Sequence, residues 1–163
     1  MTKFTVDRDQ FLAELLRAKP ALGKRDLSSH FWIGARDPSV AVVASDTVVQ
    51  VSCGLTARVR EPGTVCLPGD RLITAVKQAN KGDITISVNE THQATVVSGK
   101  LRAKIAGLPA DNFASVSPPE STRDAWKISA KNLSLAINAG GNAAHMPTEH
   151  SPATAMSVVQ IES

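Results

Sequence analysis

A short pattern of apolar residues occurs three times in this chain at a constant spacing, which constrains the fold more than any other feature. Val65 lies 61 residues after Phe4, and Trp126 lies 61 residues after Val65. The same step relates three further sets of positions: Val6, Leu67 and Ile128; Phe11, Leu72 and Leu133; and Leu15, Val76 and Ile137. Each copy has apolar residues at i and i+2, a short polar turn, and then apolar residues at helical spacing. This pattern predicts a structural repeat in which a strand leads into a helix.

The residues between strand and helix supply a helix-start signal in each copy. Asp7 can cap the first helix and Ser129 the third, because their side-chain oxygens accept hydrogen bonds from free backbone N–H groups. In the second copy, Pro68-Gly69-Asp70 predicts a turn followed by an acidic helix start. We therefore expect helices over about residues 7–19, 70–80 and 130–139.

Segments with strand character follow each of the first two helices. Alternation is clearest where Ile84, Ile86 and Val88 share one face. The predicted strands are 3–6, HFWIGA (30–35), SVAVVAS (39–45), TVVQVSCGLTARV (47–59), 64–67, DITISVN (83–89), QATVVSG (93–99) and KLRAKIAGLP (100–109). The unit is a strand, a helix and three strands, made twice. Two such units predict an α+β domain with two helices and about eight strands.

The sequence is expected to divide into three regions. Residues 1–116 hold the two complete units, and the Ser- and Pro-rich stretch 117–124 is predicted to be a linker. Residues 125–163 begin a third unit with a strand and a helix. A long Gly- and Pro-rich stretch and one last predicted strand (156–163) follow, so we expect this region to be a partial second domain.

The composition limits the classes of function. The 163 residues can bury a core without disulfides or metals, no apolar run is long enough to span a membrane, and the N-terminus has no signal-peptide core. Cys53 and Cys66 show no redox or metal spacing, which favours a reduced cytoplasmic protein. The net charge of +3 permits a nucleic-acid partner. The lack of Tyr and the few other aromatic residues disfavour a base-stacking surface for single strands.

No arrangement of residues indicates catalysis, a cofactor or a metal. The sequence contains no Gly-rich phosphate loop and no nucleophile elbow. His145, Glu149 and His150 lack a recognised ligand spacing, and we interpret them as solvated loop residues. Cys66, in the middle of a predicted strand, is interpreted as a small core residue, and Cys53 is expected to be more exposed. We therefore expect a non-catalytic protein without cofactors.

Basic residues gather on and beside the predicted helices. On the second helix the apolar stripe Leu72, Ile73, Val76 and Ala79 leaves Arg71, Lys77 and Gln78 on the polar side. The other basic residues near the helices are Arg8, Arg17, Lys19, Lys24, Arg25, Lys81 and Lys131. Taken singly, each is an ordinary solvated side chain. Taken together, equivalent helices of a repeat would present a basic face to duplex DNA, through sequence-independent and salt-sensitive phosphate contacts.

Several stretches resemble the first domain of the bacterial DNA polymerase III beta sliding clamp. They are TKFTVDRDQFLAELL (2–16), VVASD (42–46), ARVREPGTVCLPGDRLITAVKQ (57–78), ITISVNETHQATVVSG (84–99) and GLPADNF (107–113). The pieces EPGTVCLP and GLPADNF are the most specific, and AWKISAKNLSLAINA (125–139) resembles the opening of that clamp's second domain. The resemblance implies the DNA-clamp fold, with two strand–helix–three-strand units per domain and helices that line a central hole around DNA.

The resemblance also implies a function. Proteins of this family are non-catalytic processivity factors, rings that slide on duplex DNA and tether a DNA polymerase. Arg25 matches the family's DNA-contacting basic residue in the loop after the first helix, and Arg71 falls at the basic start of the second helix. The helix-face argument adds Lys24 and Lys77 to this candidate DNA-binding set.

Two functions compete, and an enzyme is the third and least supported alternative. The first is a component of a sliding clamp, either as a piece of a longer clamp or in a ring closed by about six copies. The second is a stand-alone interaction module of clamp fold that binds a clamp, a clamp loader or a polymerase and regulates it. The family clamp has three domains, and its ring closes where the first domain meets a neighbour's third domain. This sequence therefore keeps one ring-closing surface. The fold alone does not decide between these alternatives.

Overall fold

A computed structural model describes residues 1–24, 26–111, 113 and 128–143. The chain divides into two units, Met1–Pro118 and Pro119–Ser163. In the first unit the elements are β1 (Thr2–Asp7), α1 (Arg8–Ala18), two 3₁₀ helices (Lys19–Ala21 and Asp26–Ser29), β2 (His30–Arg36), β3 (Ser39–Ser45), β4 (Gln50–Thr56), β5 (Arg58–Glu61), β6 (Gly63–Pro68), α2 (Gly69–Gln78), β7 (Asp83–Val88), β8 (Gln93–Ser98) and β9 (Leu101–Ala106). The described part of the second unit contains α3 (Ala130–Ala143).

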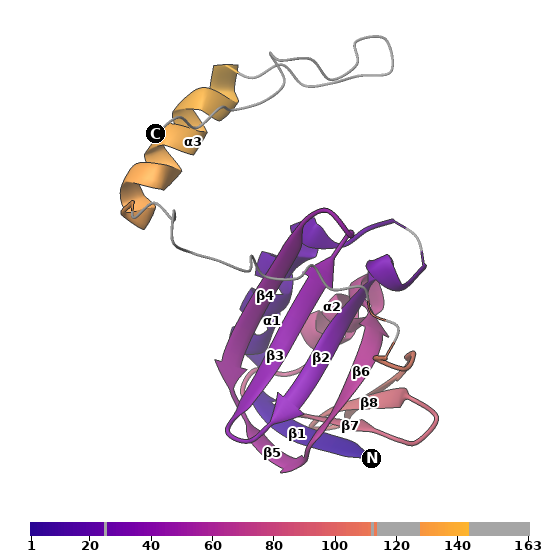
Figure 1. Ribbon diagram of the computed structural model, residues 1–163. Helices are drawn as coiled ribbons and strands as arrows, with labels where there is room; N and C mark the ends of the chain where they lie inside the picture. Colours follow the sequence, from indigo (N-terminus) through magenta and orange to yellow (C-terminus); the bar gives the residue numbers. More distant parts are fainter. Residues whose placement is uncertain (25, 112, 114–127, 144–163) are drawn as a thin grey trace. The chain divides into compact units, whose positions relative to one another are not determined.

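The two repeats exchange their opening strands. The nine strands form two antiparallel sheets, a five-stranded sheet in the order β5-β1-β7-β8-β9 and a four-stranded sheet in the order β4-β3-β2-β6. β1 opens the first repeat but pairs with β7 of the second, and β6 opens the second repeat but pairs with β2 of the first. Figure 1 shows α1 and α2 together behind the four-stranded sheet. The predicted repeat therefore folds as a single α+β unit.

The segment 47–59, predicted as one strand, is instead a turn and two strands in different sheets. The Asp46 carboxylate accepts hydrogen bonds from the N–H groups of Val48 and Val49, which closes the turn and lowers the pKa of Asp46. β4 then runs along β3, and β5 crosses to pair with β1. At the crossing the N–H group of Ala57 donates to the carbonyl of Pro38 at 2.9 Å. One continuous apolar segment thus serves two sheets, which raises the strand count in the described residues to nine.

The second repeat makes the same crossing in a shorter form. After β9 the N–H group of Gly107 donates to the carbonyl of His92 at 3.1 Å, as Ala57 does to Pro38 in the first repeat. Leu108 then pairs with Cys66 on β6, just as β5 pairs with β1. A Cβ atom at Gly107 would lie 2.6 Å from the carbonyl oxygen of His92, so the close approach requires glycine.

The repeated apolar positions form the core in the first two copies. Their side chains, at most 2% exposed, are Phe4, Val6, Phe11, Leu15, Val65, Leu67, Leu72 and Val76. Ile84, Ile86 and Val88 are buried on one face of β7, as the alternation predicted. In the third copy Ile128 and Ile137 are 55% and 45% exposed, and Trp126 lies outside the described residues. The apolar side chains of the repeated pattern are therefore buried in the first two copies, whereas Ile128 and Ile137 of the third copy are exposed.

The helix starts confirm two of the three predicted signals. Asp7 accepts hydrogen bonds from the N–H groups of Asp9 and Gln10 at 3.0 and 2.9 Å, and the Ser129 hydroxyl accepts one from Asn132 at 3.2 Å. The turn predicted at residues 68–70 is wrong, because β6 runs through Pro68 and α2 begins directly at Gly69, without a side-chain cap. The acidic helix start is confirmed, since Asp70 lies in the first turn of α2. A Cβ atom at Gly69 would collide with the Leu22 side chain, so glycine lets the helix start beside the strand.

Val76→Asp should unfold the first unit, because Val76 is fully buried on α2 and the substitution places an unpaired carboxylate in the core. We expect the free energy of unfolding to fall by more than about 3 kcal/mol, a large part of the stability of a domain of this size. Thermal unfolding followed by circular dichroism measures the effect. Gln78→Asp is the matched control: it puts the same carboxylate at an exposed position of the same helix. A normal melting temperature for Val76→Asp would contradict the assignment of this face.

Candidate nucleic-acid interface

The helices α1 and α2 run antiparallel and are joined at both ends. Arg8, at the start of α1, donates from Nε to the carbonyl of Val76 at 3.1 Å and from Nη2 to the carbonyl of Lys77 at 2.7 Å. At the other end Lys19 Nζ lies 3.2 Å from Asp70 Oδ1. The Arg8 guanidinium binds the two carbonyls where the negative end of the α2 dipole lies, so it stabilises the helix terminus. This arrangement gives the two helices one common exposed surface.

The repeat extends to the solvent-exposed positions of the two helices. The exposed residues of α1 are Asp9, Gln10, Ala13, Leu16 and Arg17, and those of α2 are Asp70, Arg71, Thr74, Lys77 and Gln78. Each residue of the second set follows its counterpart by 61 positions. We call the two sets together the helix face. Its geometry is repeated, but its chemistry is not, since Gln10 and Leu16 stand where α2 has Arg71 and Lys77.

The structure directs three of the predicted basic residues to partners within the unit. Arg8 binds the end of α2, as described above. Arg17 Nη1 lies 2.8 Å from Glu14 Oε2 on the same helix, and Lys19 pairs with Asp70. The helix face is therefore less basic than the sequence suggested. Arg71 and Lys77 are exposed and make no ion pair with the described residues, which leaves their charges available to an anionic ligand.

The loop after α1, which carries Lys24, lies against the start of α2. Lys24 is exposed and follows Leu22, whose side chain occupies the space beside Gly69, so the loop lies against the first turn of α2, which carries Arg71. The N–H group of Gly23 donates to the carbonyl of Ser28 at 2.8 Å, which closes the loop. Arg25, the remaining predicted site residue, lies outside the described residues.

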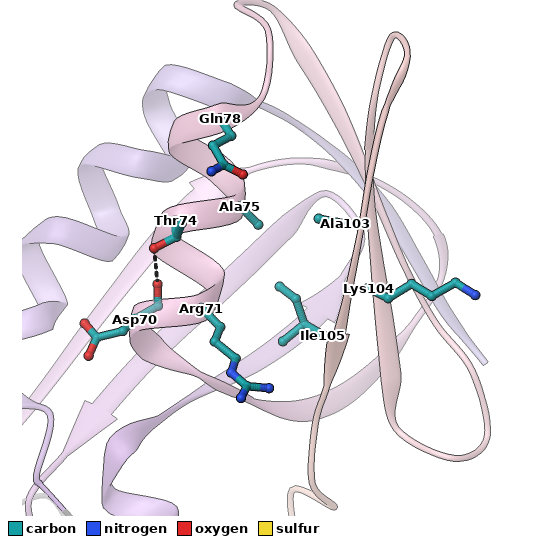
Figure 2. Close-up of a pocket in the computed structure, with 8 residues that line it drawn as sticks. All are labelled: Asp70, Arg71, Thr74, Ala75, Gln78, Ala103, Lys104 and Ile105. Atoms are coloured by element: carbon teal, nitrogen blue, oxygen red, sulfur yellow. Dashed lines mark hydrogen bonds between the residues drawn. The ribbon is translucent and has the colours of Figure 1, made fainter.

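A depression of about 470 Å³ lies between α2 and β9. Ala103 and Ile105 point from β9 toward Ala75 of α2, whereas Lys104 points away from the helix, and Arg71 reaches down the side of the depression (Figure 2). β9 is the last strand of its sheet, so one row of its main-chain groups has no strand partner in the described residues. We call this combination of depression and strand edge the β9 edge.

Both cysteines belong to the core, and Cys53 is slightly the more exposed of the two, as expected. Cys53 is 8% exposed on β4, where burial and a hydrogen bond with Glu14 raise the pKa of its thiol. Cys66 is fully buried on β6, and burial raises the pKa of its thiol to about 11. Neither thiol is a thiolate nucleophile at neutral pH.

Over the residues that the structure describes, no helix is long and apolar enough to span a membrane. The same residues contain no group of three His, Cys, Asp or Glu side chains placed to hold a metal ion. The polar side chains of the helix face are Asp, Arg, Lys, Gln and Thr, and all of these except Asp can donate hydrogen bonds to phosphate oxygens.

Solved sliding clamps share this arrangement. The beta subunit of the DNA polymerase of Streptococcus pyogenes superimposes with a TM-score of 0.80, at 20% identity, over 88% of this chain and 40% of that chain. A DnaN sliding clamp (DNA polymerase III subunit beta) from Bartonella birtlesii matches with a TM-score of 0.68, at 28% identity, over 73% of this chain and 33% of that one. These matches confirm the predicted DNA-clamp fold.

The sequence comparisons give the family. The model of the DNA polymerase III beta subunit, N-terminal domain, matches residues 2–117, and the chain belongs to this family. The beta sliding clamp of Staphylococcus aureus is 27% identical over 148 residues, which are 84% of this chain and 39% of the relative. The clamp of Staphylococcus epidermidis is 27% identical over 144 residues. The chain thus spans about two fifths of the curated relatives that it matches.

Arg8→Met should destabilise the first unit by about 1–3 kcal/mol, because it removes the charged hydrogen bonds to the end of α2. Urea unfolding measures the change. Arg17→Met is the matched control: its side chain is 67% exposed, and its ion pair with Glu14 is worth less than about 1 kcal/mol. Equal stability of the two variants would mean that Arg8 does not hold the helix pair.

Proposed function

We propose that this chain is a component of a sliding clamp that contacts duplex DNA without sequence specificity during replication. In this proposal residues 1–116 act as a first clamp domain, 117–124 as a linker and 125–163 as the start of a second domain. Membership of the DNA polymerase III beta subunit family supports the class of function. The observation that carries the proposal is the antiparallel helix pair, which presents one exposed face where Arg71 and Lys77 make no ion pair with the described residues.

The chemistry of the helix face suits the phosphates of DNA better than its bases. The exposed surface of two antiparallel helices side by side is too broad to enter the minor groove. Its cations are also not placed to make paired hydrogen bonds with the edge of a single base. Lys24, Arg25, Arg71 and Lys77 are the proposed contacts. Four or fewer phosphate contacts give weak binding by one domain, which suits a protein that moves along the duplex. The proposed site of action is cytoplasmic, where bacterial DNA is copied.

Arg25→Ala combined with Arg71→Ala should weaken duplex binding equally for unrelated sequences. Loss of two phosphate contacts should lower the slope of log K against log salt by about 2, because each contact releases roughly one counterion. Fluorescence anisotropy with two labelled duplexes of equal length, over a series of salt concentrations, measures both effects.

The matched control for this DNA experiment is Arg60→Ala with Lys100→Ala. Both residues are exposed and lie outside the helix face, so these substitutions remove the same number of positive charges elsewhere on the unit. If both double variants weakened binding alike, net charge would explain the effect. Unchanged binding by the Arg25 and Arg71 variant would remove the helix face as the DNA contact.

The β9 edge favours a second candidate function, an interaction module that binds another clamp chain, a clamp loader or a polymerase. A free strand edge can accept a further strand through main-chain hydrogen bonds, and the depression beside it can take an apolar side chain. Leu108, 40% exposed, follows this strand. Outward-facing Arg102 and Lys104 oppose the pairing of two identical edges and favour a partner that carries acidic side chains.

Light scattering after size exclusion, with the chain alone and mixed with a full-length bacterial clamp, separates the two functions. A closed multimer of the chain alone would support a clamp component that forms its own ring. A monomer that joins the full-length clamp would support the interaction module. Ala103→Arg fills the depression of the β9 edge and should abolish both self-association and binding to the full-length clamp. Lys104→Ala should abolish neither, because the Lys104 side chain points away from α2. Association unchanged by Ala103→Arg would exclude the β9 edge.

A further inference from the structure

The four-stranded sheet has a second face, turned away from the helices, that the proposed function does not use. Along β2 the buried residues Phe31 and Ile33 belong to the core that packs under α1 and α2. The alternate residues Trp32, Gly34 and Arg36 therefore project from the opposite face, which is the near face of the sheet in Figure 1. A partner on this face would not compete with a duplex on the helix face.

An open depression of about 460 Å³ lies on this second face. Gly34 pairs with Ala41 on β3 and with Thr64 on β6, and since cross-strand partners share a face, these small residues lie in one row along the floor. Trp32 and Pro62 also line the depression, and Arg36 lines it at the end of β2. We call this hollow the outer depression.

The Trp32 ring occupies the space that a side chain at position 34 would need. A Cβ atom on Gly34 would lie 2.7 Å from Cζ3 of the indole, so the ring lies directly over the glycine. The indole is half-buried and keeps a part of its surface toward solvent. A large aromatic side chain fixed beside an apolar floor is typical of the centres of protein interfaces.

Arg36 gives the outer depression its charge. Its side chain is exposed, and its guanidinium makes no ion pair with the described residues. The nearby Asp37 carboxylate accepts a hydrogen bond from the N–H group of Val59 at 3.3 Å. A guanidinium at the rim of an apolar hollow matches a carboxylate on an apolar ligand, because it can donate two parallel hydrogen bonds to it.

We propose that the outer depression binds an extended peptide segment of another protein, in which an apolar side chain adjoins a carboxylate. A single layer of strands and the residues beside it form the hollow, so a small molecule would stay open to water on one side, unlike ligands in enclosed pockets. A second copy of the chain related by a twofold axis close to Arg36 would bring two guanidinium groups of like charge together. Charge complementarity therefore selects an acidic and apolar peptide.

Nuclear magnetic resonance of the full chain tests this proposal, with a capped pentapeptide containing adjacent leucine and aspartate as the probe and the leucine–asparagine peptide as its control. We expect the aspartate peptide to shift the amide signals of Gly34, Ala41 and Thr64, and to bind about fivefold more tightly than the asparagine peptide. Shifts confined to the β9 edge, or none at millimolar peptide, would overturn the proposal. Concentration-dependent shifts of the same amides without peptide would overturn it in favour of self-association.

Two variants assign the roles of the floor and the cation. Ala41→Leu fills the floor from a strand position that points away from the core, and it should remove binding of both peptides. Arg36→Gln should leave binding of the asparagine peptide unchanged and should abolish the preference for the aspartate peptide. A double-mutant cycle over the two proteins and the two peptides measures this coupling. Arg102→Gln, which removes an exposed arginine from the other sheet, is the control and should keep that preference. A preference that survives Arg36→Gln would contradict the proposed contact.

Discussion

The exchange of opening strands between the two repeats is the constraint on which the rest of this fold depends. β1 supplies its apolar face to the sheet of the second repeat, and β6 supplies its own to the sheet of the first. Neither repeat has a complete sheet without the other, so the two cannot unfold separately without exposing core residues such as Phe4 and Leu67. Because each helix follows directly from an exchanged strand, the exchange also places α1 and α2 side by side.

Periodicity predicted most of the elements because each strand and helix has one buried face. The repeated residues Leu15 and Val76 are both fully buried, which explains why a spacing of 61 residues was visible in the sequence. The crossing at Ala57 could not be predicted in this way. The segments on either side of it alternate alike, and what separates them is a hydrogen bond to Pro38, a residue that is close only in the folded chain.

In the candidate site, too, features set by local periodicity were predicted, whereas contacts between residues far apart in the sequence were not. Arg71 and Lys77 were predicted from the helical stripe, Arg71 also from the family resemblance, and both are exposed on the predicted side of α2. The roles of Arg8 and Lys19 were not predicted, since their partners on α2 lie far along the chain. The unpaired Arg36 on the opposite face was also missed. Its importance comes from the neighbours that the sheet register provides, and no spacing in the sequence reveals them.

The helix face combines a repeated backbone with unequal side chains, so its positive charge is distributed unequally between α1 and α2. Of the matched positions, those on α1 carry Gln10, Leu16 and an Arg17 that pairs with Glu14, and those on α2 carry Arg71, Lys77 and Gln78. A rod-shaped polyanion lying across both helices would be attracted more strongly by one than by the other. In the proposed complex the duplex would therefore rest off the midline of the helix pair. The repeated fold therefore gives a symmetric pair of helices, and a few unequal surface residues place more positive charge on one of them.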